Sequence, residues 1–175
     1  MIDRKYDVVV IGGGIIGLAT SMKLTQDFPR LKVAVLEKEK EVAQHKQGNN
    51  SGVINAGISY APGTKKANFC STGGKLLRDF CDQHGVAYDM CGKLIVATDE
   101  TEIPQLEELY KRGTENGAEG LRMVDEEEIR EIEPYSAGVK AIFSPNTGII
   151  DYFEVSQAYA TSMRENGGDL LTDVE

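Results

Sequence analysis

The sequence predicts an α/β fold that begins with a parallel βαβ unit. A short apolar run at residues 6–11 precedes a glycine cluster, an amphipathic stretch at 14–27 and a second apolar run at 31–37. Strand, glycine turn, helix and strand within about 30 residues form a right-handed crossover between parallel neighbours. The run from Val8 to Ile11 is apolar without alternation. We therefore expect this first strand to be buried on both faces.

Helices and strands alternate along the remaining chain. A polar segment rich in small residues follows the first unit and is long enough to suggest a binding loop, at residues 38–62. A helix is expected after it, with Gly85 as its C-cap. The elements expected from this point are helices at 65–84, 102–116, 125–132 and 151–166, and strands at 93–98, 139–143 and from Leu170 onward. A last strand cut off by the chain end predicts a truncated domain.

Composition excludes several classes of protein. The 175 residues carry a formal net charge of −9, which would repel a nucleic-acid backbone, so no nucleic-acid partner is expected. The apolar runs are too short for a transmembrane segment. Cys70, Cys81 and Cys91 lack the spacing of a zinc site or a disulfide framework, so we expect reduced thiols, no metal and a cytoplasmic protein. A peripheral contact at the inner membrane stays open.

The glycine cluster after the first strand has the spacing of a dinucleotide-binding fingerprint. It reads Gly12-Gly-Gly-Ile-Ile-Gly17, a GxGxxG between a strand and a helix. Gly12 would allow the tight turn, Gly14 the close approach of a pyrophosphate, and Gly17 the packing of helix against strand. The phosphates would then lie at the helix amino terminus, against Gly14, Ile15 and Ile16. These residues are the first part of the predicted cofactor site.

An acidic residue completes the fingerprint. Glu37 closes the second strand 20 residues after the last glycine, where its carboxylate can accept both ribose hydroxyls; this favours FAD or NAD over NADP. The alternative of a glycine-rich turn with a surface glutamate lacks this strand–turn–helix–strand context. The long polar loop favours FAD, and we assign Lys38, Asn50, Ser51 and Gly52 to the same cofactor site.

Four collinear segments have a recognisable pattern, at residues 48–70, 91–97, 131–134 and 144–151. They read GNNSGVINAGISYAPGTKKANFC, CGKLIVA, EIEP and SPNTGIID. This pattern resembles the L-2-hydroxyglutarate dehydrogenase/oxidase family, within the D-amino-acid-oxidase-like superfamily of FAD-dependent oxidoreductases. The resemblance covers almost the whole chain but less than half of a family member.

The resemblance implies a Rossmann-like FAD-binding domain interleaved with an α+β substrate domain. Residues 1–82 and 152–175 would belong to the FAD domain, and 83–151 would begin the substrate domain. It also implies oxidation of an L-2-hydroxy acid to a 2-oxo acid by hydride transfer to flavin N5, with a quinone or another acceptor taking the electrons. The catalytic base of the family would lie beyond Glu175.

The chain departs from the family pattern at two positions. Family members commonly read HNSGVIH, and this chain has Asn49 and Asn55 at the two histidine positions. Asparagine cannot take a proton at working pH or anchor a flavin, so we predict non-covalent FAD. Asn55 and Lys66 are weak catalytic candidates, since a structural loop asparagine and a solvated lysine are the simpler interpretations.

Two other functions stay open at this point. A related flavoprotein that oxidises an amino acid or glycerol 3-phosphate would share the fold, because fold does not fix the substrate. A catalytically silent nucleotide-binding fragment is an alternative of a different class. Uptake of FAD and bleaching of the flavin by L-2-hydroxyglutarate would separate the three.

Overall fold

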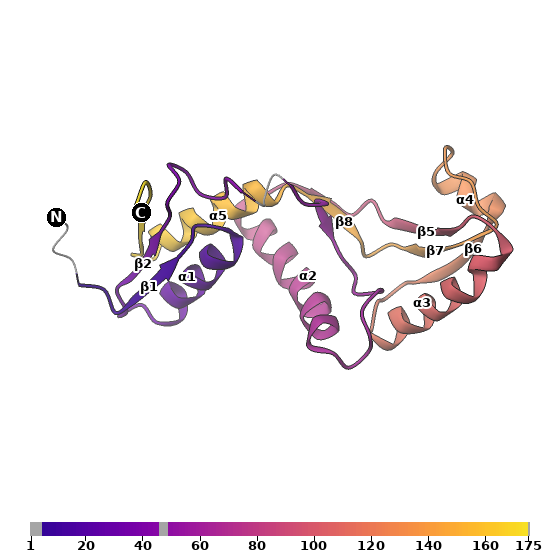
Figure 1. The fold of residues 1–175 in the computed structure, drawn as a ribbon, viewed down its shortest axis with the longest axis horizontal. Helices are drawn as coiled ribbons and strands as arrows, with labels where there is room; N and C mark the ends of the chain where they lie inside the picture. The colour runs from indigo at the N-terminus through magenta and orange to yellow at the C-terminus, as the bar shows by residue number, and fades with distance from the viewer. Residues whose placement is uncertain (1–4, 46–48, 175) are drawn as a thin grey trace. The chain divides into compact units, whose positions relative to one another are not determined.

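The computed structural model describes residues 5–45 and 49–174, and the chain forms two compact units (Figure 1). The first unit comprises residues 1–52 and 151–175, and the second comprises residues 53–150. The chain leaves the first unit once and returns to it once. The division expected from the resemblance, into an FAD-binding domain of residues 1–82 and 152–175 and a substrate-domain segment of residues 83–151, stays a prediction.

The first unit contains a three-stranded parallel sheet and two helices. Its elements are β1 (Val8–Ile11), α1 (Ile15–Asp27), β2 (Val33–Leu36), α5 (Tyr152–Glu165) and β9 (Asp169–Leu171). The strand order is β1-β2-β9, and both strand pairs are parallel. The predicted α/β fold, with its βαβ unit at the start, is confirmed.

The two helices of the first unit pack side by side. Leu18 and Met22 of α1 and Val155 and Met163 of α5 are buried, which removes their apolar side chains from water. The helix α1 also contacts β1 and β2, and α5 contacts β9. Both helices therefore cover the same face of the sheet.

The burial expected for the first strand is wrong. Side chains of β1 alternate between half-buried and exposed, and Val9 and Ile11 are 49% and 88% exposed. Among the described strands β1 pairs with β2 alone, so it stands at an edge of the sheet. The central strand β2, in contrast, has Val33 and Val35 fully buried. An apolar run does not reveal which strand of a sheet is central.

The second unit contains two antiparallel sheets of three strands each. Their orders are β3-β8-β4 and β5-β7-β6. The strands are β3 (Val53–Ile54), β4 (Tyr88–Asp89), β5 (Lys93–Ala97), β6 (Arg122–Asp125), β7 (Lys140–Ser144) and β8 (Gly148–Ile150), and the helical elements are α2 (Lys65–His84), η1 (Glu100–Glu102), α3 (Ile103–Glu115) and α4 (Glu126–Ile132).

Both faces of the β5-β7-β6 sheet are covered. Ile142 of β7 packs with Leu106 of α3 in one cluster, whereas its neighbour Ala141 packs with Ile129 of α4 in another. Successive side chains of a strand point to opposite faces. Because of this period of two, α3 lies against one face and α4 against the other.

Capping residues fix the helix ends of the second unit where the sequence predicted them. The hydroxyl oxygen of Thr64 accepts from the Ala67 amide at 3.3 Å at the start of α2, and Gly85 ends the helix with φ at 69°. Asp125 caps α4 by accepting from the Glu128 amide at 3.0 Å. The strands β3, β4, β6 and β8 were not expected from the sequence.

Candidate dinucleotide site

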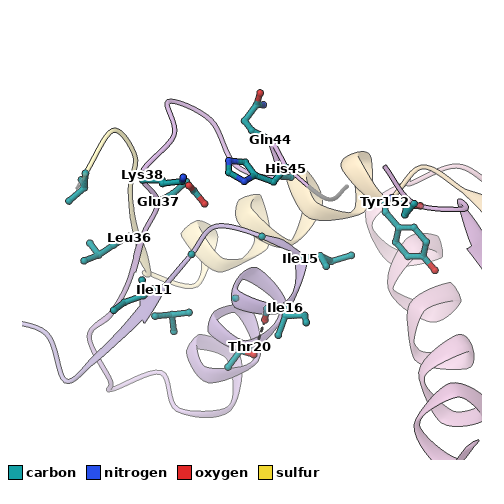
Figure 2. A pocket seen from close by; sticks show the side chains of 17 residues that line it. Ile11, Ile15, Ile16, Thr20, Leu36, Glu37, Lys38, Gln44, His45 and Tyr152 are labelled. Carbon is teal, nitrogen blue, oxygen red and sulfur yellow. Dashed lines mark hydrogen bonds between the residues drawn. The ribbon is translucent and has the colours of Figure 1, made fainter. Parts of the chain in front are cut away.

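A pocket of about 1230 Å³ lies over the glycine turn of the first unit. The carboxyl ends of β1 and β2, the turn and the first part of α1 form its floor (Figure 2). Three residues of the loop after β2 also line the pocket, namely Ala43, Gln44 and His45. Asn50, further along the chain, is a lining residue as well. A crevice at the carboxyl ends of parallel strands is where open α/β sheets bind ligands.

Two glycines of the turn are required by its geometry. Gly12 has φ at 103°, a backbone conformation that other residues rarely adopt. A Cβ atom on Gly17 would overlap the carbonyl oxygen of Gly12. The helix thus starts directly against the turn, as the fingerprint predicts for these two positions.

The amino terminus of α1 presents unpaired amides to the pocket. The first turn, Ile15 to Gly17, lines the pocket, and its amides have no acceptor within the helix. The N-cap residue Gly14 has no side chain to bond them, and the first turn contains no acidic residue. These amides and the helix dipole together favour an anion such as a diphosphate at this position.

The carboxylate of Glu37 faces the glycine turn. Its Oε2 atom accepts from the Gly13 amide at 2.6 Å, and its Oε1 atom accepts from the Glu39 amide at 3.0 Å. A Cβ atom on Gly13 would lie 3.0 Å from the Glu37 side chain. The middle glycine of the cluster, for which the fingerprint has no requirement, therefore makes room for the acidic residue.

The side chains of Lys38, Glu39 and His45 gather beside Glu37. His45 Nε2 lies 2.8 Å from Glu39 Oε1, and Lys38 Nζ lies 3.6 Å from the same oxygen. The hydrogen bond from His45, assisted by Lys38, holds the pKa of Glu39 below its ordinary value. Figure 2 shows Glu37, Lys38 and His45 on the same side of the turn. His45 could not be identified from the sequence, because it has no partner at a recognisable spacing.

Most of the cofactor residues expected from the sequence line this pocket. Within the described chain these are Gly12, Gly14, Ile15, Ile16, Gly17, Glu37, Lys38 and Asn50, whereas Ser51 and Gly52 are not among the lining residues. Asn50 Oδ1 accepts from the Gly52 amide at 2.7 Å, which forms a local turn. The assignment of these residues to a cofactor stays a proposal.

Other lining residues were missed. Thr20 lies one turn beyond Ile16, whose carbonyl oxygen accepts from the Thr20 hydroxyl at 2.8 Å. Tyr152 and Val174 come from the returning part of the chain. The helical spacing from Ile16 to Thr20 could have identified the threonine. Nothing in the local sequence places Tyr152 or Val174 near the glycine turn.

The two weak catalytic candidates lie in the second unit. Asn55 follows β3 and lines a smaller hollow, and its Nδ2 donates to the Val53 carbonyl oxygen at 3.3 Å. Lys66 is exposed in the first turn of α2 and lines neither described hollow. Asn49, at the other family histidine position, donates to the His45 carbonyl oxygen at 3.1 Å.

The part of the chain at residues 5–45 and 49–174 contains no group of three metal-binding side chains. None of its helices combines the length and apolar character that crossing a bilayer requires. The three cysteines are free thiols.

Comparison with known proteins places the chain among flavoproteins. The sequence profile described as FAD dependent oxidoreductase matches residues 7–175. A mitochondrial L-2-hydroxyglutarate dehydrogenase of Nematostella vectensis is 51% identical, with 98% of this chain and 38% of the relative covered. The mitochondrial L-2-hydroxyglutarate dehydrogenase of Homo sapiens is 48% identical, with 98% and 37% covered. The chain therefore spans less than half the length of these relatives.

A solved structure shows the same fold with a cofactor present. It is the dithionite-reduced L-α-glycerophosphate oxidase from Mycoplasma pneumoniae with FAD bound. The TM-score is 0.91 at 33% identity, and the match covers 98% of this chain and 46% of that chain. The chain thus has the fold of an FAD-binding protein over nearly all its residues.

Proposed function

The chain belongs to the FAD dependent oxidoreductase family, and on that premise we propose that it holds the ADP portion of FAD in an enzyme oxidising L-2-hydroxyglutarate to the 2-oxo acid. The pocket over the glycine turn, with Glu37 at its edge, is the observation that carries the proposal. The identity to L-2-hydroxyglutarate dehydrogenases supports the substrate.

The residues of the pocket match the parts of the cofactor. The free amides of Ile15, Ile16 and Gly17 would hold the diphosphate, because they offer donors and a favourable dipole. Glu37 would hold the ribose, since a carboxylate accepts from two neighbouring hydroxyls. The hydrogen bond from the Gly13 amide fixes that carboxylate in the pocket beforehand. Lys38 adds a positive charge at the rim.

The chemistry divides between cofactor and protein. FAD, when bound, supplies the acceptor of the hydride from the substrate carbon. Asn55 would orient the substrate by hydrogen bonds, because its amide does not take a proton at working pH. We assign the proton-accepting group to neither Asn55 nor Lys66.

A second function is favoured by one comparison. The glycerophosphate oxidase shares 33% identity and the fold, so oxidation of a 2-hydroxy phosphate ester on the same scaffold is the competing proposal. A silent nucleotide-binding fragment is the third. The electron acceptor, a quinone or another oxidant, and the cytoplasmic location stay predictions, and both relatives compared above are named mitochondrial.

One experiment separates these functions. The purified chain is supplied with FAD, and the absorbance of the oxidised flavin is followed without oxygen after addition of L-2-hydroxyglutarate or L-α-glycerophosphate. Bleaching by the hydroxy acid alone supports our proposal, and bleaching by the phosphate ester supports the competitor. FAD uptake without bleaching by either compound, both in this chain and in a protein of the relatives' full length that contains it, contradicts both and supports the silent fragment.

A further inference from the structure

A second hollow lies wholly within the unit of residues 53–150. It has a volume of about 90 Å³. The loop at residues 55–60, Lys93 at the start of β5 and Thr147 before β8 line it. Liquid water occupies roughly 30 Å³ per molecule, so the hollow has room for a group of about three heavy atoms.

The loop is held in shape by α3 and by Asn116 just beyond it. Asn116 Nδ2 donates to the carbonyl oxygens of Gly57 at 2.9 Å and Tyr60 at 2.8 Å. Gly113 of α3 lies so close that a Cβ atom there would be 3.3 Å from the Ile58 side chain. The two hydrogen bonds from the Asn116 side chain and the close contact between Gly113 and Ile58 fix the backbone of the loop before any ligand binds.

The loop contains backbone donors without acceptors. Within the described chain, the Gly57 amide bonds the sulfur of Cys70, and the amides of Ala56 and of residues 58–60 donate no hydrogen bond. The peptide bonds are trans, so the Ile58 amide points opposite to the Gly57 carbonyl and hence away from Asn116. Gly57 has φ at 81°. Successive free amides that follow a residue of positive φ form a concavity that binds anions.

One positive charge completes the hollow. No carboxylate in residues 5–45 and 49–174 pairs with the Lys93 ammonium, and none of the lining residues is acidic. Among the described residues, the side-chain amide of Asn55 donates only to the Val53 carbonyl oxygen, at 3.3 Å. Because this bond is long, the amide can turn to a ligand. The Thr147 hydroxyl is already engaged with Ser144 at 3.0 Å.

From this arrangement we propose that the hollow binds one carboxylate group of the 2-hydroxy-acid substrate. The free amides would bond the carboxylate oxygens, and Lys93 would neutralise their single charge. A phosphate dianion would keep an unpaired charge here, so the site favours a carboxylate. The identity of the ligand rests on the proposed function, whereas the anion site rests on the hollow alone.

The test is a titration followed by NMR. The ¹⁵N-labelled chain with FAD supplied is titrated with glutarate, with butyrate and with inorganic phosphate. We expect saturable shifts at the amides of residues 56–60 with both carboxylates and weaker binding of phosphate. Lys93→Met should weaken glutarate binding roughly tenfold, and Lys93→Arg should restore most of it. Lys111→Met is the control. It removes one positive charge from an exposed position of α3 outside the hollow, and it should leave glutarate binding unchanged.

Three results would overturn the inference. These are glutarate shifts outside residues 55–60, equal weakening by Lys93→Met and Lys111→Met, and phosphate binding tighter than glutarate. The two proposals fail separately. Flavin bleaching by L-2-hydroxyglutarate with no shift in this loop removes the carboxylate site alone. Glutarate shifts in the loop without bleaching remove the proposed function alone.

Discussion

The carboxylate of Glu37 accepts a hydrogen bond of 2.6 Å from the backbone amide of Gly13. The end of β2 is thereby tied to the turn after β1, two segments that are neighbours only through the parallel pairing of their strands. The bond also orients an acceptor toward the pocket without help from a ligand. The ribose position of the proposed site is therefore set by the fold itself.

Glu37→Gln should lower the affinity of the chain for FAD. The amide keeps the shape of the side chain but loses the charge that strengthens its bonds to hydroxyls, so we expect a loss of roughly tenfold or more. Flavin fluorescence titration measures it. Asp27→Asn on α1 removes an equal charge outside the pocket and should have no effect. Equal affinities for the two variants would refute the ribose role.

Gly17→Ala should destabilise the first unit and weaken FAD binding together. The added methyl group overlaps the carbonyl oxygen of Gly12, and overpacking of this kind costs about 1–3 kcal/mol. Urea unfolding measures the change. Gly73→Ala is the matched control, because that position in α2 has open space around it. There alanine should stabilise the helix by about 0.5–1 kcal/mol. A Gly17→Ala protein as stable as the parent would contradict the close approach.

His45→Ala should raise the pKa of Glu39 toward its ordinary value of 4.5. His45 is the largest cause of the lowered pKa, and Lys38 contributes less. A carboxyl whose folded pKa is lowered stabilises the protein above its unfolded pKa, and this stability is lost as the pH falls through the folded value. NMR titration of the side-chain carboxyl in the parent chain and in the variant gives the two pKa values. An unchanged Glu39 titration would exclude the pairing.

The three thiols should react with iodoacetamide in the order of their exposure. Cys91 is exposed, Cys70 is half-buried and Cys81 is buried. Burial, with a smaller effect of Asp82, raises the pKa of the Cys81 thiol to about 11. At pH 8 about one thiol in a thousand is then ionised at this position. Mass spectrometry of tryptic peptides follows the labelling. Labelling of Cys81 as fast as Cys91 would mean that α2 opens in solution.

FAD should dissociate intact when the chain is denatured by acid. The two positions where the family commonly has histidine are Asn49 and Asn55 here, and an amide side chain does not form a covalent bond to flavin under ordinary conditions. After acid precipitation we expect all yellow colour in the supernatant. Asn49→His and Asn55→His serve as comparison variants. Colour retained in the pellet of the unaltered chain would disprove the non-covalent assignment.

The parts of the fold that could be predicted are those with a local signal. The helix at residues 65–84 was expected with both ends correct, and Gly85 was recognised as its C-cap. Thr64, which caps the start, also has a residue type that N-caps favour. The strands β3 and β4 contain two residues each, too few to show a period of two. They exist because β8 lies between them, and a pairing between distant segments has no local signature.

The residues of the candidate site likewise include some that a local sequence pattern predicts and some that it does not. Gly12, Gly17 and Glu37 were predictable, because their spacing follows from the geometry of one βαβ unit. His45 and Tyr152 were not, since the first depends on the path of an irregular loop and the second on the return of the chain to the first unit. Ser51 was assigned to the same pocket from composition alone, and composition does not give the direction of a side chain.

The edge position of β1 favours self-association of the chain at high protein concentration. The strand forms ladder bonds on one side only within the described residues, and it exposes Val9 and Ile11. The unpaired N–H and C=O groups of an edge strand can form ladder hydrogen bonds with an extended segment of another molecule, including the same strand. Self-association would begin at the strand that leads directly into the glycine turn. Concentrated preparations should therefore lose nucleotide-binding capacity as they aggregate, and dilute ones should keep it.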